Sequence, residues 1–492
     1  MSKQKRQEAW NACMGVSWDS LDEEIPSSSI GGTIPKSLRG GRLLSNGPGW
    51  TKIGGRTAHP FDGHGYIRSF FFDEKGSCHL RGRFVETPSY KRERAAGTLV
   101  VRGLATNPSA QFWKNIKAGG EPRHVANTTI VRWKDKLLAG WEGGAPYALD
   151  AATLATQGEE HFGGALAGQA TLAHLRHDAA ADRLVACSPK MGRHTGFTFR
   201  EINAEGKAVV ERTAQISGMV FAHDFAITPN WYILGGNPLR LKVGEFLKSY
   251  MGFSTLFQAI ATDASQGGAL YLISRLRDGE VKKVDLPHGA WVIHFGNAFE
   301  RGGEVIVDAC AFQRFDFGGE FGYTGPDTSF DPTLPDQREP QRLYRLSLPL
   351  DGRPARCEQY TAYGIDFPRF HPDHEGRETP ALYGATRSDT RHSDPFDSVI
   401  RVDLCDPERP AALWSAPEDV FVGEPIFVPD VQGDGAQGHV LVLASWGLAR
   451  KSELLIFDAL RLGAGPVATI PLPLLPIAFH GAWDPPKTDG RK

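Results

Sequence analysis

The run Leu343-Tyr-Arg-Leu-Ser-Leu-Pro-Leu-Asp-Gly352 is a β-type stretch that ends directly in a turn signal. Short runs of the same kind recur along the chain, at residues 98–102, 128–133, 231–234, 269–274, 304–308 and 439–444. Clusters of glycine, proline, asparagine and aspartate separate them, as at residues 46–49 and 141–146. Many short strands with turns between them predict an all-β fold, either a sandwich, a barrel or a propeller.

The length of the chain favours the propeller among these folds. At roughly 150 residues per domain, 492 residues would make about three domains, but no linker or strong shift in composition divides the sequence. A sandwich of this size would be unusually large, whereas about six to eight blades with long loops would absorb the length. The 56 glycines and 33 prolines are too many for a helical bundle and too irregularly spaced for collagen.

Charge and cysteine content argue against several classes of protein. A formal net charge of −2 gives no basis for nucleic-acid binding, which usually shows as a strongly basic face. The six cysteines include no CxxC pair, which argues against zinc ribbons, and a disulfide framework is not expected in so long a chain. The N-terminus shows no apolar signal region, and no apolar run reaches about 18 residues. We therefore expect a protein of a reducing compartment, the cytoplasm.

One segment, residues 243–260 (VGEFLKSYMGFSTLFQAI), has a helical pattern. Its large apolar side chains lie close to helical spacing: Phe246, Leu247, Tyr250, Met251, Phe253, Leu256, Phe257 and Ile260. One interpretation is a helix that faces the core. The other is an interfacial patch that dips into a bilayer and gives access to a lipophilic substrate, so that the protein contacts the membrane peripherally as a monotopic protein.

Four of the 16 histidines stand in unusual contexts. Each follows an apolar stretch: Thr171-Leu-Ala-His174, Phe221-Ala-His223, Trp291-Val-Ile-His294 and Pro476-Ile-Ala-Phe-His480. Burying an imidazole without a partner is costly, so four such residues invite a shared explanation. The sequence contains no local metal motif such as HExxH. Any metal site must therefore draw its ligands from remote parts of the chain, as the converging inner strands of a propeller permit.

Other segments stand in a definite order around these histidines. They are Asn46-Gly-Pro48, His59-Pro-Phe-Asp-Gly-His-Gly65, Ala126-Asn-Thr-Thr129, Trp141-Glu-Gly-Gly-Ala-Pro146, Val422-Gly-Glu-Pro-Ile-Phe-Val-Pro429 and Arg450-Lys-Ser-Glu-Leu454. In this order, over nearly the whole chain, they resemble the carotenoid cleavage oxygenases, a family that includes apocarotenoid oxygenases, the retinal pigment epithelium isomerohydrolase and lignostilbene dioxygenases. The four histidine contexts are similar to the family's AHPxxD, HDFxxT, HxxNAxE and FHGxW patterns, with Leu175 in place of the proline of the first.

The resemblance implies a seven-bladed β-propeller with a dome of loops and helices over one face. It also implies that His174, His223, His294 and His480 hold Fe(II) on the propeller axis. Residues so far apart can meet at one ion only in an undivided fold. We therefore expect a single domain over residues 1–492, with an N-terminal extension of about residues 1–30 and an apolar insertion at about residues 240–262.

The resemblance further implies three carboxylates that orient the ligating imidazoles. Glu142 and Glu424 match two of the family's glutamates, and Asp366 stands where the third would be. Aspartate is one methylene shorter, so a direct contact with the imidazole is in doubt, and either a bridging water or a small backbone shift would have to compensate. The alternative is that Asp366 only caps a turn before Pro368.

The family's chemistry predicts an oxygenase that cleaves a conjugated C=C bond with O2. Members that cleave lignostilbenes have a lysine before the first glutamate, whereas this chain has Trp141, which favours an apolar apocarotenoid or carotenoid and a retinal-like aldehyde product. Phe61, Trp141 and Phe221 are candidates for an apolar substrate tunnel or for ordinary core, and Thr128 is expected near the open side of the iron. The alternatives are a stilbene-cleaving dioxygenase, an isomerase of a retinoid or carotenoid, and a non-catalytic propeller that binds a carotenoid.

Overall fold

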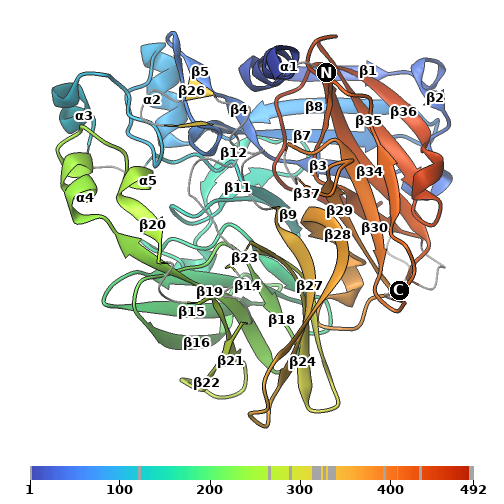
Figure 1. Ribbon diagram of the computed structural model, residues 1–492. Coiled ribbons are helices and arrows are strands. Elements are labelled where there is room, and N and C mark those ends of the chain that lie inside the picture. Colours follow the sequence, from blue (N-terminus) through green and yellow to red (C-terminus); the bar gives the residue numbers. More distant parts are fainter. Residues whose placement is uncertain are drawn as a thin grey trace.

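The structure, a computed structural model, describes most of the chain (Figure 1). The described residues are 3–119, 123–263, 267–286, 291–312, 323–324, 329–330, 340–391, 395–406, 408–430 and 435–486. In these residues the chain is mostly β, as the recurring apolar runs predict. Of the seven quoted runs, only residues 98–102 lack a strand, because they form an irregular connection after α2 (Pro88–Ala96).

Seven antiparallel sheets carry most of the strands, and we number them in chain order. Sheet 1 contains β1 (Ser20–Ile25), β8 (Cys78–Phe84), β7 (His64–Phe72), β4 (Pro48–Trp50), β3 (Arg42–Ser45) and β37 (Gly481–Asp484). Sheet 2 contains β9 (Thr129–Trp133), β10 (Lys136–Gly140), β11 (Tyr147–Asp150) and β12 (Thr156–Glu159). Sheet 3 contains β13 (Arg176–Asp178), β14 (Arg183–Lys190), β15 (His194–Ile202) and β16 (Ala208–Ser217). Sheet 4 contains β17 (Val220–Phe221), β18 (Phe225–Ile227), β19 (Trp231–Leu241), β20 (Ile260–Thr262), β21 (Ala269–Ser274) and β22 (Val281–Asp285).

Sheets 5 and 6 share the long strand β28 (Arg356–Arg369). Sheet 5 also contains β23 (Trp291–Arg301), β24 (Glu304–Phe312) and β27 (Arg342–Pro349), and sheet 6 contains β29 (Ala381–Thr386), β30 (Ser398–Asp403) and β31 (Ala412–Ser415). Sheet 7 contains β2 (Gly31–Gly32), β32 (Val420–Val422), β33 (Ile426–Pro429), β34 (Gly438–Trp446), β35 (Lys451–Asp458) and β36 (Pro466–Pro473). Two small pairs complete the strands: β5 (Lys52–Ile53) with β6 (Arg56–Thr57), and β25 (Tyr323–Thr324) with β26 (Ser329–Phe330).

Hydrophobic clusters lie between each sheet and the next, from sheets 1 and 2 through to sheets 6 and 7. A further cluster joins sheet 7 back to sheet 1. One strand can contribute to two clusters, because side chains alternate between the two faces of a strand, and β34 is an example. Val440 and Val442 face the cluster shared with sheet 6, and Leu441 and Leu443 face the one shared with sheet 1. The seven sheets and their serial packing fit a propeller-like fold.

Strands from the two ends of the chain pair with strands of the same two sheets, sheet 1 and sheet 7. The C-terminal strand β37 pairs with β3 in sheet 1, and the N-terminal strand β2 pairs with β36 in sheet 7. The first 30 residues also contribute β1 to sheet 1 and form α1 (Lys3–Gly15), whose Trp10 ring lies 5.1 Å from the ring of Phe421. These pairings bind the first and last sheets to each other.

Helices α2, α3 (Phe112–Ala118), α4 (Val243–Tyr250) and α5 (Leu256–Ala259) gather on one side of the molecule (Figure 1). The single helix predicted over residues 243–260 is wrong, because α4 and α5 are separate. The chain turns between them at Gly252, whose φ of +79° lies in the left-handed region, and a capping box of Thr255 and Gln258 then starts α5.

The apolar side chains of this region face outward. Tyr250 is 79 % exposed and Leu247 is 53 % exposed, so the interpretation of a core-facing helix is wrong. We call the following residues the apolar patch: Leu104, Phe112, Trp113, Ile116, Val243, Phe246, Leu247, Tyr250, Met251, Phe253 and Leu256. The rings of Phe112 and Phe253 stack at 4.3 Å, which holds α3 against the turn after α4. None of the helices in the described parts of the chain combines the length and the apolarity needed to cross a bilayer.

Candidate metal centre

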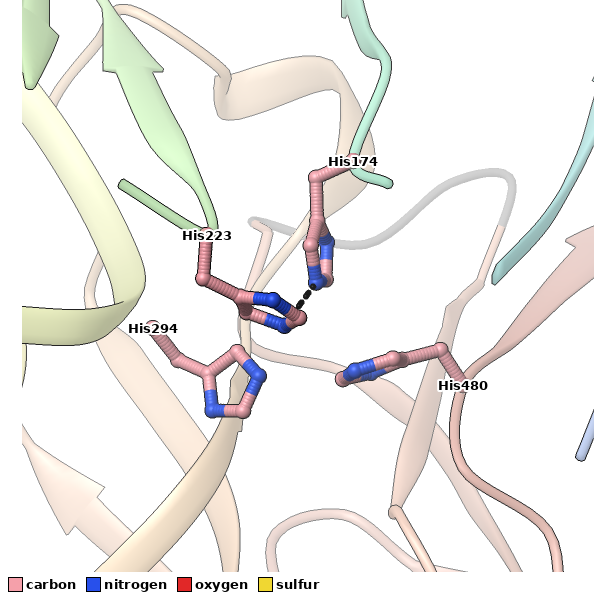
Figure 2. Close-up of side chains that lie close together, drawn as sticks. All are labelled: His174, His223, His294 and His480. Carbon is pink, nitrogen blue, oxygen red and sulfur yellow. Dashed lines mark hydrogen bonds between the residues drawn. The ribbon is translucent and has the colours of Figure 1, made fainter. Parts of the chain in front are cut away.

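Four different sheets bring the four selected histidines together. His174 lies just before β13 in sheet 3, and His223 lies between β17 and β18 in sheet 4. His294 lies within β23 in sheet 5, and His480 immediately precedes β37 in sheet 1. Figure 2 shows the four imidazoles converging on one point. One ligand atom from each histidine lies within 4.8 Å of the other three, so the group could hold a metal ion.

The spacing of these nitrogens fits a single ion. The Nε2 atoms of His174 and His223 lie 3.3 Å apart, as the dashed line in Figure 2 indicates. Imidazole nitrogens bind divalent ions such as zinc at about 2.1 Å, so two on opposite sides of one ion would be about 4.2 Å apart. Among the described residues, the buried Nε2 of His294 has no hydrogen-bond partner. A metal ion at this point would give that atom the partner that a buried polar group requires.

The remaining three sheets supply the carboxylates predicted from the sequence. Glu142 follows β10 in sheet 2, Asp366 lies on β28 where it pairs with sheet 6, and Glu424 lies between β32 and β33 in sheet 7. Each contacts the Nδ1 atom of one histidine. Glu142 contacts His223, Asp366 lies 2.6 Å from His294, and Glu424 lies 2.8 Å from His480. An imidazole whose Nδ1–H is held by a carboxylate can offer Nε2 to a metal.

Metal binding requires neutral imidazole, and the surroundings favour the neutral form of His174 and His480. Burial and the neighbouring imidazoles hold the pKa of His174 well below its usual value. Burial also lowers the pKa of His480, although the adjacent Glu424 carboxylate opposes this effect. For His223, burial opposes the charged form, but Glu142, through its charge and its hydrogen bond, together with Asp224 and Asp366 raises the pKa. A bound cation would compete with that proton for the imidazole.

Asp366 reaches its histidine directly, without a bridging water. Strand β28 has a register shift between Asp366 and Arg369, and Phe367 within this bulge has a φ of +52°. A bulge bends its strand and redirects the local side chains, which brings the shorter carboxylate up to His294. The alternative that Asp366 only caps a turn is wrong, because Asp366 pairs with Ala385 within the sheet.

A charged residue that sequence reasoning missed, Arg369, supports Glu424. Arg369 binds both oxygens of Glu424 at 2.8 Å, and the backbone N–H of Gly481 donates to the same carboxylate at 2.7 Å. Burial raises the pKa of Glu424, but Arg369 and His480 overcome this and lower it to about 2. Glu424 therefore stays ionised. The signal for Arg369 was present, since Arg369 lies only three residues after Asp366, in the segment Asp366-Phe-Pro-Arg369.

His174 differs from the other three histidines. The carboxylate beside it is Asp224, whose Oδ1 lies 3.8 Å from Nδ1, which is beyond hydrogen-bond distance. Asp224 is held instead by Arg176 at 2.6 Å and by the backbone N–H of Phe295 at 3.0 Å. Asp224 directly follows His223 in the sequence, and that adjacency was the only available signal.

Of the four substrate residues predicted from the sequence, Phe61 and Thr128 lie beside the segment that carries His480. Phe61 belongs to a short 3-10 helix (Pro60–Asp62), and its ring centroid lies 5.9 Å from that of Phe479. The carbonyl oxygen of Thr128 accepts a hydrogen bond from the backbone N–H of His480 at 3.2 Å. Both residues are therefore positioned by the same piece of chain as a candidate ligand.

Phe221 and Trp141 lie in different surroundings. Phe221 packs against the hydrophobic cluster that contains Trp291 and Ile293, next to His294. Trp141 is 3 % exposed and belongs to the hydrophobic cluster between sheets 1 and 2. Its indole N–H donates to the carbonyl of Ala145 at 3.2 Å. Trp141 is thus packed as core, although it directly precedes Glu142.

Comparisons with known proteins agree with this arrangement. Residues 18–485 match the profile of the retinal pigment epithelial membrane protein family. The chain is 32 % identical to the apocarotenoid-15,15'-oxygenase of Synechocystis sp., over 95 % of this chain and 93 % of that protein. It is 30 % identical to the chloroplastic carotenoid cleavage dioxygenase 7 of Oryza sativa subsp. japonica, over 94 % and 89 % of the two chains. The crystal structure of cobalt-substituted Synechocystis ACO superposes with a TM-score of 0.89 at 30 % identity, over 98 % of this chain and 99 % of that one.

Proposed function

Because the chain belongs to the retinal pigment epithelial membrane protein family and is an oxygenase of the carotenoid cleavage type, we propose a specific reaction for it. In this proposal the protein cleaves a conjugated C=C bond of an apocarotenoid or carotenoid in an Fe(II)-dependent reaction. One O2 is consumed and the double bond is divided into two aldehydes, one of them retinal-like, so the reaction needs no external reductant. The observation that carries this proposal is the cluster of four histidines, three of them held by carboxylates.

His174, His223, His294 and His480 would hold the iron, and the bound iron(II) would supply the activation of dioxygen. Imidazole is a suitable ligand for iron, and four neutral imidazoles would leave the ion and its ligands with the full charge of the ion. Glu142, Asp366 and Glu424 fix the orientation of three imidazoles through Nδ1. With four histidines as its protein ligands, the ion would keep room for dioxygen or water beside the substrate.

The protein's own contribution to the reaction is to place one double bond of a polyene beside that point. The rings of Phe61, Phe479 and Phe257 form a contiguous aromatic surface next to His480, with centroid separations of about 6 Å. Thr128 is fixed to the same segment, and Phe221 extends the apolar surroundings towards His294. Such a lining binds an apolar chain by shape and keeps water away from it.

The residue before Glu142 favours a polyene over a hydroxystilbene. Trp141 offers no cation to a phenolic oxygen, unlike the lysine that lignostilbene-cleaving members have at this position. A stilbene-cleaving dioxygenase remains the second candidate, since that activity occurs in the family the sequence resembles.

For the fold, we propose that the seven sheets form one closed seven-bladed propeller, a single domain over residues 1–492, with α2 to α5 as part of a dome over one face. Two observations support closure. Hydrophobic clusters join every sheet to the next, including sheet 7 to sheet 1, and strands from both chain ends interlock sheets 1 and 7. The residues that meet at the candidate metal centre come from all seven sheets.

We also propose that the apolar patch, which includes most of residues 243–260, contacts a membrane. Carotenoids partition into bilayers, so an enzyme that extracts them gains from an apolar surface next to its substrate entrance. Phe257 of α5 supports this link, because its ring lies 6.0 Å from that of Phe61. All six cysteines are free thiols, which fits the cytoplasm as the compartment.

The direct test of the proposed activity is incubation of the iron-loaded protein with β-apo-8′-carotenal under air, with products identified by mass spectrometry. Two shorter aldehydes are expected. His174→Ala should abolish both iron binding and cleavage, whereas His177→Ala, three residues away with a half-exposed side chain, should retain both. Turnover of stilbenes alone would make the substrate assignment wrong. A product of unchanged mass would indicate an isomerase, and a folded protein that takes up no Fe(II) would indicate a carotenoid-binding protein.

A further inference from the structure

Arg68 is the largest fully buried side chain in the described residues. It lies in the middle of β7 in sheet 1, on the same face of the strand as Phe70 and Phe72. Burial lowers the pKa of its guanidinium to about 10, so the group is still charged at neutral pH. Burying a cation is costly unless its N–H groups donate hydrogen bonds, so the acceptors around Arg68 decide whether its burial is tolerated.

Its hydrogen-bond acceptors are backbone carbonyl oxygens. The Nη2 atom donates to Pro476 at 2.8 Å and to Ile477 at 2.9 Å, and Nη1 donates to Tyr66 at 3.2 Å. Two of the three bonds therefore go to the segment that leads from β36 to His480. This segment, residues 474–480, has no regular secondary structure. Within the described residues, the carbonyls of Pro476 and Ile477 accept no hydrogen bond from a neighbouring strand, and Arg68 supplies their donor.

The same segment is also held by the backbone of Asn46 and Gly47. The N–H of Phe479 donates to the carbonyl of Asn46 at 2.8 Å, and the N–H of Asn46 donates to the carbonyl of His480 at 2.9 Å. A Cβ atom on Gly47 would lie only 2.6 Å from the carbonyl oxygen of Ile477, so only glycine allows this approach. The segment is therefore held both by the backbone of residues 46–47 and by the guanidinium of Arg68.

We infer that Arg68 is a positioning residue for the metal centre, which fixes the placement of His480 and of the aromatic Phe479 by holding the carbonyls of Pro476 and Ile477. The inference rests on the proposed role of His480 as a metal ligand. If the guanidinium is removed, two buried carbonyls lose their donor, and the irregular segment shifts to find another. His480 and Phe479 follow in the chain only two to four residues later, and they move with it.

The test compares Arg68→Met, which keeps the apolar stem, with Arg68→Lys, which keeps the charge and can reach one carbonyl. Metal-free full-length protein is titrated with Co²⁺, and both the dissociation constant and the visible absorption spectrum of the bound ion are recorded. Substitution of a residue that orients a metal ligand typically weakens affinity 10- to 100-fold. We expect a loss of about that size for Arg68→Met with an altered spectrum, and a smaller loss for Arg68→Lys.

Phe70→Leu is the matched control, because Phe70 is fully buried two residues along the same face of β7 and packs in the cluster between sheets 7 and 1. It should lower the melting temperature but leave the Co²⁺ affinity and spectrum unchanged. Wild-type affinity and spectrum in Arg68→Met would overturn the inference, as would unfolding of both Arg68 variants, since Arg68 would then serve global stability. A wild-type protein that binds no Co²⁺ through its histidines would instead refute the proposed function itself.

Discussion

Replacing Asp366 by glutamate should weaken metal binding in this chain, although glutamate is the residue that the family pattern has at this position. The Oδ1 atom of Asp366 already lies 2.6 Å from Nδ1 of His294, at the short end of charge-assisted hydrogen bonds. Glutamate adds one C–C bond of about 1.5 Å. The bulge at Phe367 has brought the backbone close enough for the shorter side chain, so the longer one has no free space in front of it.

The size of the effect follows from overpacking. Asp366 is 9 % exposed, and extra methylene groups in a packed interior cost about 1–3 kcal/mol. If the displaced carboxylate moves His294, this cost falls on the metal-bound state and raises the dissociation constant roughly 5- to 150-fold, at about 1.4 kcal/mol per factor of ten. We expect a loss of Co²⁺ affinity of roughly 5-fold or more in a titration of the metal-free protein.

Asp308→Glu is the control for this experiment. Asp308 is fully buried on β24 of the adjoining sheet 5 and binds Arg345 through both oxygens, at 2.8 and 2.9 Å. Its extension should destabilise the fold without changing metal affinity. The reasoning about the bulge would be refuted if Asp366→Glu bound Co²⁺ as tightly as the wild type, because the backbone would then have room for either side chain.

Three further predictions concern stability, the apolar patch and close packing near the metal centre. Burial lowers the pKa of His64 to about 4 from 6.5, so the unfolded chain binds a proton more readily than the folded protein. His64 should therefore lower the free energy of unfolding by about 2 kcal/mol between pH 7 and pH 5 in urea titrations, and a His64→Gln variant should show a pH dependence that is smaller by this amount. Leu247→Glu should reduce sedimentation of the protein with liposomes several-fold, because it removes an exposed apolar side chain from the apolar patch. Val209→Glu on β16, which also replaces an exposed apolar side chain but lies outside the patch, should leave sedimentation unchanged. Equal binding by both variants would count against the membrane proposal. Gly140→Ala would place a carbon 2.3 Å from the carbonyl oxygen of Ala173, the residue directly before His174. We expect the substitution to lower the free energy of unfolding by about 1–3 kcal/mol and to weaken Co²⁺ binding. Unchanged Co²⁺ binding would show that the backbone can move to accommodate the extra carbon without displacing His174.

Much of the metal centre could be predicted because its residues lie in distinctive local contexts. Each selected histidine follows an apolar strand-type run, and each carboxylate lies in a short segment of characteristic composition. The structure brings all seven of these residues to one place. The substrate residues were less predictable. Trp141 adjoins a carboxylate in sequence but packs in the core, because successive residues at a strand end point in different directions.

The residues that support the centre were not identified from the sequence, although Arg369 and Asp224 each lie close to a selected residue. Arg369, Asp224 and Arg68 look like ordinary charged residues in a chain that contains many. Their partners are distant in sequence: Arg68 binds carbonyls more than 400 residues away, and Arg369 binds a glutamate 55 residues away. The break between α4 and α5 was also missed, because the apolar spacing continues across Gly252 while its backbone turns.

The sequence by itself determined the β architecture, the family and the identity of the candidate ligands, because alternation, turn residues and motif order are properties of neighbouring residues. Only the tertiary structure decided which carboxylate holds which imidazole, that Asp366 reaches His294 through a bulge, and that the apolar residues of α4 face outward. These depend on how sheets and loops pack. Contacts such as Asp366 with His294, across 72 residues, exist only when separate sheets meet around one centre.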